Sequence, residues 1–204
     1  MALPGRNAEN PDPSAGGQIE TDTYDLEGLV QTVLAGITVV AAVVVFVAHR
    51  DNPMVALLLA AMVGVSGWLS IIDLAERRLP NRIVYPLAVV VTAGLLLAGL
   101  WTQDFSRSGR AMLIGLAASL LFLLGNLLGG IGMGDVKYAY PLWATLGWFG
   151  TPPVTNAVFV TILVGGITSV VILAMGKGRK YRLPFGPFMS IGFVAGLLAA
   201  APGL

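Results

Sequence analysis

Residues 111–150 read AMLIGLAASLLFLLGNLLGGIGMGDVKYAYPLWATLGWFG, and the ten residues GGIGMGDVKY (129–138) join two apolar segments within them. The first segment is long and apolar enough for a membrane-spanning helix, which needs about 20 such residues. The junction breaks two local rules, because it holds four glycines and a carboxylate, Asp135. Glycine weakens helices, and a charge at a membrane span is costly. Since such departures tend to mark functional sites, this stretch points to both the fold and its chemistry.

The composition of the whole chain favours a membrane protein. Of 204 residues, 56% are hydrophobic and 11% charged, and the mean hydropathy is +0.81. Soluble domains carry about 25% charged residues. The net charge of +1 provides no basic face for nucleic acid, so no nucleic-acid partner is expected. The lack of cysteine excludes disulfides, zinc–thiolate sites and cysteine nucleophiles.

The hydropathy pattern predicts an all-α polytopic membrane protein with about seven transmembrane helices (six to seven). Residues 1–27 hold six of the 11 acidic residues and are rich in Pro, Gly and Asn. We therefore expect a disordered acidic tail at 1–27 and one membrane domain at 28–204. The expected spans are 28–48, 53–73, 83–101, 111–130, 135–150, 154–175 and roughly 187–201.

Loop charges predict the orientation of these spans. With seven spans, the tail and every second loop share one side of the membrane, and that side holds most basic residues near the membrane. Cytoplasmic loops are enriched in Lys and Arg, so this side, with the N-terminus, is expected to be cytoplasmic. Its basic residues are Arg77, Arg78, Arg82, Lys137, Lys177, Arg179, Lys180 and Arg182, against Arg50, Arg107 and Arg110 opposite.

Two carboxylates, Asp73 and Asp135, are expected at this same face. Asp73 ends the second span and Asp135 begins the fifth. Two acids held close in a low dielectric do not both ionise easily, so the pair can share one proton, as in aspartic proteases. One carboxylate then activates water while the other polarises the scissile carbonyl.

The glycines near Asp135 have two interpretations. Gly125 and Gly129 have the spacing of a small-xxx-small contact between helices, which we favour for that pair. Gly132 and Gly134 lead directly to the acid. For these two we favour a functional loop, because glycine lets another chain approach the backbone closely.

At this point the motifs resemble a known family. GMGDVK (132–137) is similar to the Gly-x-Gly-Asp motif of intramembrane aspartic proteases, in particular the type IV prepilin peptidases and preflagellin peptidases. IIDLAERRLPNRIVYP (71–86) resembles the first catalytic segment of that family, and LPFGPFMSIG (183–192) resembles the segment that opens its last helix. The resemblance covers about residues 55–200.

This resemblance implies the roles of individual residues. Asp73 and Asp135 become the catalytic dyad of an aspartic endopeptidase, with Gly132, Gly134 and Lys137 in the motif around the second acid. Asn81 follows the first acid and is expected either to orient Asp73 or to cap a helix. The implied reaction removes the basic leader of pilin, pseudopilin or Flp-type precursors just before their hydrophobic helix, at the cytoplasmic face of the inner membrane. No cofactor or metal is expected.

The resemblance also sets expectations about partners. Bacterial members with a cysteine-containing N-terminal region methylate their product. This chain resembles a minimal form without that region, so N-methyltransferase activity is not expected. The expected partners are a prepilin-like precursor and the lipid bilayer, and a homo-oligomer is left open.

Two other functions compete with this interpretation. A small transporter or proton-coupled channel also uses intramembrane acids, and it would place them near the bilayer midplane within an inverted repeat. The second competing function is binding of a divalent cation by the two acids, but two carboxylates provide fewer ligands than a dedicated site for such a cation requires.

Overall fold

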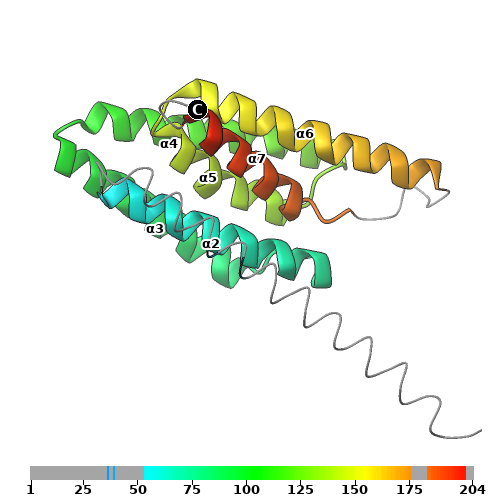
Figure 1. Cartoon of the computed structure of the whole chain (residues 1–204). Helices are drawn as coiled ribbons and strands as arrows, with labels where there is room; N and C mark the ends of the chain where they lie inside the picture. The colour runs from blue at the N-terminus through cyan, green and yellow to red at the C-terminus, as the bar shows by residue number, and fades with distance from the viewer. Residues whose placement is uncertain (1–35, 37–38, 40–52, 176–182, 201–204) are drawn as a thin grey trace, which may run out of the picture.

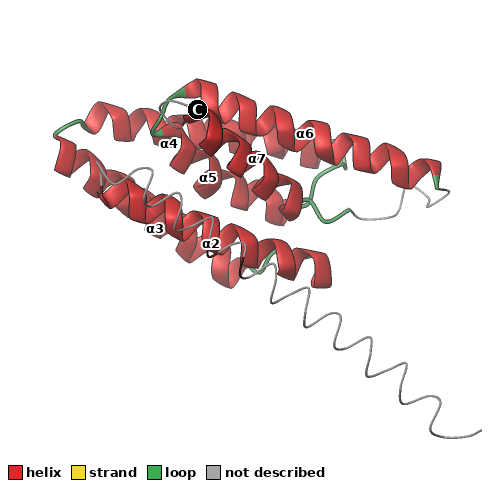
Figure 2. Ribbon diagram, in the orientation of Figure 1, coloured by secondary structure: helices red, strands yellow, loops and turns green. Residues whose placement is uncertain are grey.

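The described helices pack side by side in one bundle (Figures 1 and 2). The computed structural model describes residues 36, 39, 53–175 and 183–200, and every regular element within them is a helix. The tail at 1–27 lies outside the described residues, as does nearly all of the span expected at 28–48. The elements are α2 (Pro53–Glu76), α3 (Asn81–Thr102), α4 (Phe105–Leu127), α5 (Met133–Gly147), α6 (Thr151–Ala174) and α7 (Gly186–Ala200).

Four of these helices, α2, α3, α4 and α6, are long and apolar enough to cross a membrane. The expectation of an all-α polytopic membrane protein is confirmed, but the count of seven spans is not. Helix α5 has 15 residues, or about 22 Å at 1.5 Å per residue, which is short of the roughly 30 Å hydrocarbon core. Helix α7 is also described over only 15 residues.

Helix α5 lies at the centre of the bundle and touches every other helix from α2 to α7. Figure 1 shows it in the middle, with α6 above it and α2 and α3 below. Most of its side chains are buried, including the large aromatic residues Tyr138 and Trp143. The segment expected to span the membrane at 135–150 is therefore a short core helix that its neighbours shield.

Small residues let α4 approach α5 closely. A Cβ at Gly115 would stand only 2.5 Å from the Cβ of Ala144, and one at Gly147 would stand 2.8 Å from the carbonyl oxygen of Ala111. The helix contact expected at Gly125 and Gly129 is wrong. Gly125 faces Ile131 of the next loop, and Gly129 lies beyond the end of α4 with a φ of +80°. Glycine at 129 serves the turn, because a left-handed backbone is strained for other residues.

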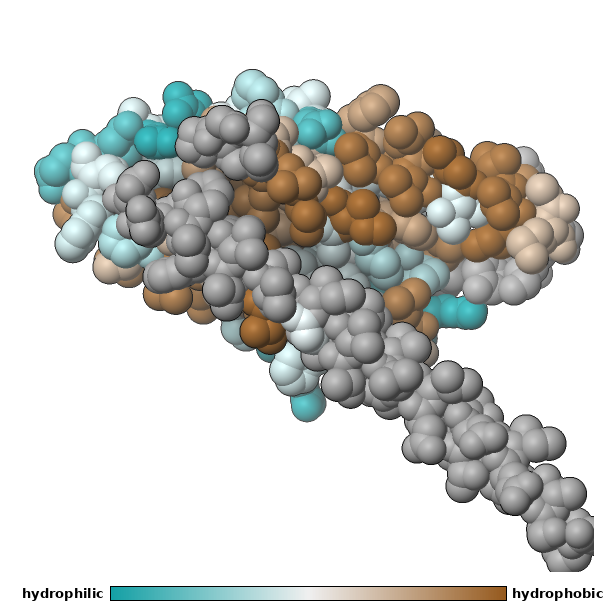
Figure 3. Space-filling model, viewed as in Figure 1, coloured by the Kyte–Doolittle hydropathy of each residue, from teal (hydrophilic) through white to brown (hydrophobic). Residues whose placement is uncertain are grey.

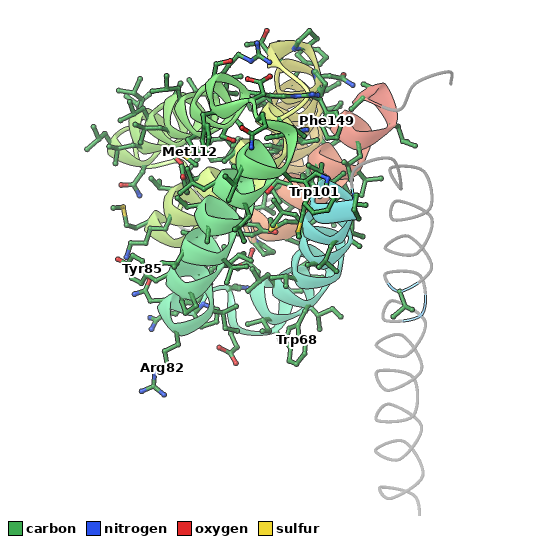
Figure 4. All side chains as sticks on the ribbon, turned by 90° about the vertical axis from the view of Figure 1, so that its left-hand side faces the viewer. Trp68, Arg82, Tyr85, Trp101, Met112 and Phe149 are labelled. Atoms are coloured by element: carbon green, nitrogen blue, oxygen red, sulfur yellow. The ribbon has the colours of Figure 1, made fainter. Side chains whose placement is uncertain are left out.

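The outer surface of the bundle is largely apolar. Figure 3 shows hydrophobic atoms over α6 and α7, and hydrophilic atoms gathered at the end where α3 passes into α4. Trp68 and Trp101, both labelled in Figure 4, are exposed at 68% and 63%. Because an exposed apolar surface of this extent is rare in soluble monomers, it fits a lipid environment.

The polar end of the bundle is stabilised by local bonds. Asp104 caps α4 by accepting a hydrogen bond from the backbone N–H of Arg107 at 3.0 Å. The Arg107 guanidinium donates to the carbonyl of Trp148 at 2.9 Å and stacks 4.7 Å from the centre of its ring. These contacts tie the start of α4 to the turn between α5 and α6.

Candidate active site

The two carboxylates predicted to act together both lie buried near helix ends. Asp73 is three residues from the end of α2, and Asp135 is the third residue of α5. Their exposed fractions are 4% and 7%. A buried carboxylate needs hydrogen-bond donors or a shared proton, because leaving water costs it solvation.

Each carboxylate accepts one hydrogen bond from the backbone N–H of a glycine. Gly186 donates to Asp73 Oδ2 at 2.7 Å, and Gly132 donates to Asp135 Oδ2 at 3.2 Å. Both donors stand at a helix start, Gly186 as the first residue of α7 and Gly132 as the N-cap of α5. The first N–H groups of a helix have no partner within it, so they are free to hold an anion.

Both donor positions are crowded by the carboxylate that they bind. A Cβ at Gly186 would stand 2.9 Å from Asp73 Oδ2, and one at Gly132 would stand 2.9 Å from Asp135 Oδ2. A side chain at either place would push the carboxylate away from the N–H that binds it.

The structure brings the two acids to one place in the bundle. Helix α5 contacts both α2 and α7, and Asp135 interacts electrostatically with Asp73. Leu79, in the turn that follows α2, packs onto the glycine motif, since a Cβ at Gly134 would lie 3.1 Å from the Leu79 Cβ. The absence of a side chain at Gly134 therefore lets the turn after Asp73 pack closely against α5, the helix that carries Asp135.

Asn81 and Lys137, two further predicted site residues, form a separate cluster at this end. Lys137 Nζ donates to Asn81 Oδ1 at 3.1 Å and lies 5.0 Å from the ring centre of Tyr85. Arg82 and Tyr85 are labelled on α3 in Figure 4, where Arg82 extends away from the bundle. The capping role expected for Asn81 is wrong, because Pro80 holds the N-cap position of α3 without a side-chain cap.

The sequence did not point to several residues that surround the acids. Gly186 lies within the motif at 183–192, but the residue type gave no indication that its N–H would bind Asp73. Four buried or half-buried hydroxyl residues on the helices of the site were also missed. They are Ser66, Ser70, Tyr138 and Ser190. A signal for the first three existed in their helical spacing from Asp73 or Asp135.

Comparisons with known proteins identify the family of this chain. Residues 57–170 match the model of the type IV leader peptidase family. The chain is 36% identical to a prepilin leader peptidase/N-methyltransferase of Burkholderia pseudomallei (strain 1026b) over 143 residues, which are 66% of this chain and 43% of that protein. It is 34% identical to a type 4 prepilin-like proteins leader peptide-processing enzyme of Escherichia coli O78:H11 over 152 residues, 67% of this chain and 50% of that protein.

A prepilin leader peptidase/N-methyltransferase of Xanthomonas campestris pv. campestris is 29% identical over 140 residues, 64% of this chain and 44% of that protein. The chain spans half or less of the length of these relatives, and no solved structure matches it. The family match covers more than half of the chain and includes both acids. The chain belongs to the type IV leader peptidase family.

Proposed function

We propose that this protein is a membrane aspartic endopeptidase that removes the leader peptide of prepilin-like precursors at the cytoplasmic face. The observation that carries this proposal is the pairing of Asp73 and Asp135, two buried acids on different helices that are each held by one glycine N–H. The family membership and the names of the relatives support leader-peptide processing.

The chemistry follows from two carboxylates that share one proton. The ionised member takes a proton from a water molecule, whose oxygen attacks the scissile carbonyl carbon. The protonated member gives its proton to the carbonyl oxygen, which yields a neutral tetrahedral intermediate. The first acid then passes its proton to the leaving amine nitrogen as the C–N bond breaks, and the second recovers its proton from the collapsing intermediate. The Oδ2 atoms stay bonded to Gly132 and Gly186, which leaves Oδ1 of each acid for water and substrate.

The rim around Asp135 suits an extended peptide. Gly132 is exposed although Asp135 beneath it is buried, and Leu128 and Met133 beside this turn are exposed at 89% and 50%. A precursor strand could lie on the glycine backbone at this point. We assign the Lys137–Asn81 cluster to the approach of the substrate, beside the start of α5.

The distribution of charge supports the cytoplasmic placement. Arg77, Arg78 and Arg82 lie in or next to the turn after Asp73, at the same end as Lys137, while Arg107 and Arg110 lie at the start of α4, at the opposite end. The basic residues at 177–182 and the N-terminus lie outside the described residues. The positions of both acids at helix ends favour a peptidase over a transporter with acids at the midplane.

The test is processing of a co-expressed prepilin-like precursor by wild type and by the single variants Asp73→Asn and Asp135→Asn. Each variant removes an acid–base group, which contributes about 10²–10⁴-fold to a rate, so we expect cleavage to fall below detection while the protein still inserts. The matched control is Asp104→Asn, which changes an acid at the other end of the bundle. Continued cleavage by either dyad variant would rule out this mechanism.

A further inference from the structure

A chain of hydroxyl groups connects α2, α5 and α7 beneath the two acids. Tyr138 on α5 donates to Ser66 Oγ on α2 at 2.8 Å. Ser190 on α7 shares a hydrogen bond of 2.7 Å with Ser70 on α2, and its hydroxyl also lies 3.1 Å from the Ser66 carbonyl. These are the three helices that carry Asp73, Asp135 and Gly186.

The hydroxyl chain is in register with the site. Tyr138 follows Asp135 by three residues, and Ser190 follows Gly186 by four. Ser66 and Ser70 precede Asp73 by seven and three residues. Residues three, four or seven apart lie on one face of a helix. At 1.5 Å per residue, the chain therefore lies about 5–10 Å along the helices from the acids.

Donors and acceptors match at the first link of this chain, between Tyr138 and Ser66. Tyr138 is completely buried and has one proton to donate, which goes to Ser66 Oγ, while the Ser66 hydroxyl bonds to the carbonyl of Met62. Tyr138 also interacts with Ser190 and with Asp135. Buried hydroxyls without partners are costly, so each bond resists a shift of one helix against another.

We propose that Tyr138 is a positioning residue that, through Ser66 and Ser190, sets the separation of Asp73 and Asp135. This inference rests on the proposed peptidase function. Tyr138 and Asp135 lie on the same side of α5, so a bond from Tyr138 to α2 holds the Asp135 face of α5 against the Asp73 face of α2. A displacement of about 1 Å at a reacting pair can cost about 10²-fold in rate, so a bond that fixes this distance matters for turnover.

The first experiment compares Tyr138→Phe with Tyr140→Phe in the purified full chain, using a prepilin-like precursor as substrate. Tyr140 is the matched control because its hydroxyl also bonds to another helix, at 2.9 Å from Thr92 Oγ1 on α3. We expect Tyr138→Phe to lower kcat by about ten- to a hundredfold with KM changed less than about twofold, and Tyr140→Phe to change neither. Equal kcat values for the two variants would overturn the proposal.

The second experiment measures the separation of the acids without activity. The chain has no cysteine, so the double variant Asp73→Cys, Asp135→Cys carries the only two thiols. Cross-linking by a short bifunctional thiol reagent should slow at least severalfold when Tyr138→Phe is added, and should not slow with Tyr140→Phe. An unchanged cross-linking rate would overturn the proposal even if the kinetics changed.

Ser66→Ala removes the acceptor and keeps the tyrosine ring, so it serves if Tyr138→Phe does not accumulate. Tyr138→Phe and Ser66→Ala break the same hydrogen bond. The loss of kcat in the double variant should therefore be much smaller than the product of the losses in the two single variants. Independent, multiplying effects would contradict the inference. Failure of the two proposals is distinguishable: cleavage by Asp73→Asn or Asp135→Asn would refute the peptidase, whereas full activity of Tyr138→Phe beside inactive dyad variants would refute only the positioning role.

Discussion

Replacement of Gly186 by alanine tests whether a backbone N–H holds the first acid in place. The new methyl carbon would stand 2.9 Å from Asp73 Oδ2, 3.1 Å from its Cβ and 3.3 Å from its Cγ. Carbon atoms of neighbouring groups ordinarily stay about 3.5 Å or more apart. The side chain of Asp73 and the start of α7 must therefore separate by roughly half an ångström, which lengthens the 2.7 Å bond from the Gly186 N–H.

The expected loss follows from that shift. A misplacement of about 1 Å costs about 10²-fold, so half of it costs about tenfold. Weakening a hydrogen bond to a charged group, worth about 1.5–3 kcal/mol, adds to that loss. We expect Gly186→Ala to lower kcat by about ten- to a hundredfold. Overpacking of this kind also destabilises the fold, by about 1–3 kcal/mol.

The assay is the initial rate of precursor cleavage by purified protein, with thermal melting measured on the same samples. The control is Gly64→Ala on α2, where a Cβ meets no atom within 4 Å. That change should leave the rate unaltered and slightly favour the helix, since alanine is the better helix former. A wild-type rate for Gly186→Ala would refute the argument that this N–H positions Asp73.

Three further predictions follow from contacts around the bundle. Lys137→Ala should raise KM more than it lowers kcat, because Lys137 bonds to Asn81 rather than to the acids; a kcat effect alone would place it in the chemistry. Arg107→Ala should lower the melting temperature and Arg107→Lys should restore little, because the guanidinium both donates to the Trp148 carbonyl and stacks on its ring. Hydrogen bonds from the Ser106 hydroxyl and the Arg107 N–H hold the pKa of Asp104 below its ordinary 3.8. A carboxylate whose pKa is lower in the folded state stabilises the fold at pH values above its unfolded pKa, and this stabilisation is lost as the pH falls through the folded pKa. The difference in melting temperature between wild type and Asp104→Ala should therefore shrink from pH 6 to pH 3.

Hydropathy predicted the location of the apolar segments more accurately than the residues at which the helices begin and end. The expected spans at 53–73 and 83–101 fall inside α2 and α3, with ends within three residues. The span expected at 111–130 was displaced, because α4 begins at Phe105 and ends at Leu127. Asp104 caps α4, whose first two turns hold Ser106, Arg107 and Arg110, and polar turns of helix carry no apolar signal. At the other end, Gly129 and its left-handed backbone stop the helix.

The sequence placed the two acids but not the groups that hold them. Asp73 and Asp135 stood out because a carboxylate in an apolar segment is unusual in its own right. The donors Gly186 and Gly132 act through backbone N–H groups, which every residue but proline carries, so their use depends on where helices dock. Tyr138 and Ser66 have nothing in the sequence around them that sets them apart. They are 72 residues apart in the chain and form a hydrogen bond only because α2 and α5 pack together.

The bonds that build the site also hold the bundle together at this end. Helices in lipid gain little from the hydrophobic effect against one another, so close packing and interhelical hydrogen bonds carry a larger share of their association. Between α2 and the pair α5 and α7, those bonds are the Gly186–Asp73 contact and the hydroxyl chain that begins at Tyr138. A change that loosens the acids therefore also loosens the helices, and activity and stability should fall together for Gly186→Ala. Asp73→Asn should lower activity without an equal loss of stability, because the amide oxygen can still accept the hydrogen bond from Gly186 while the acid–base group is lost.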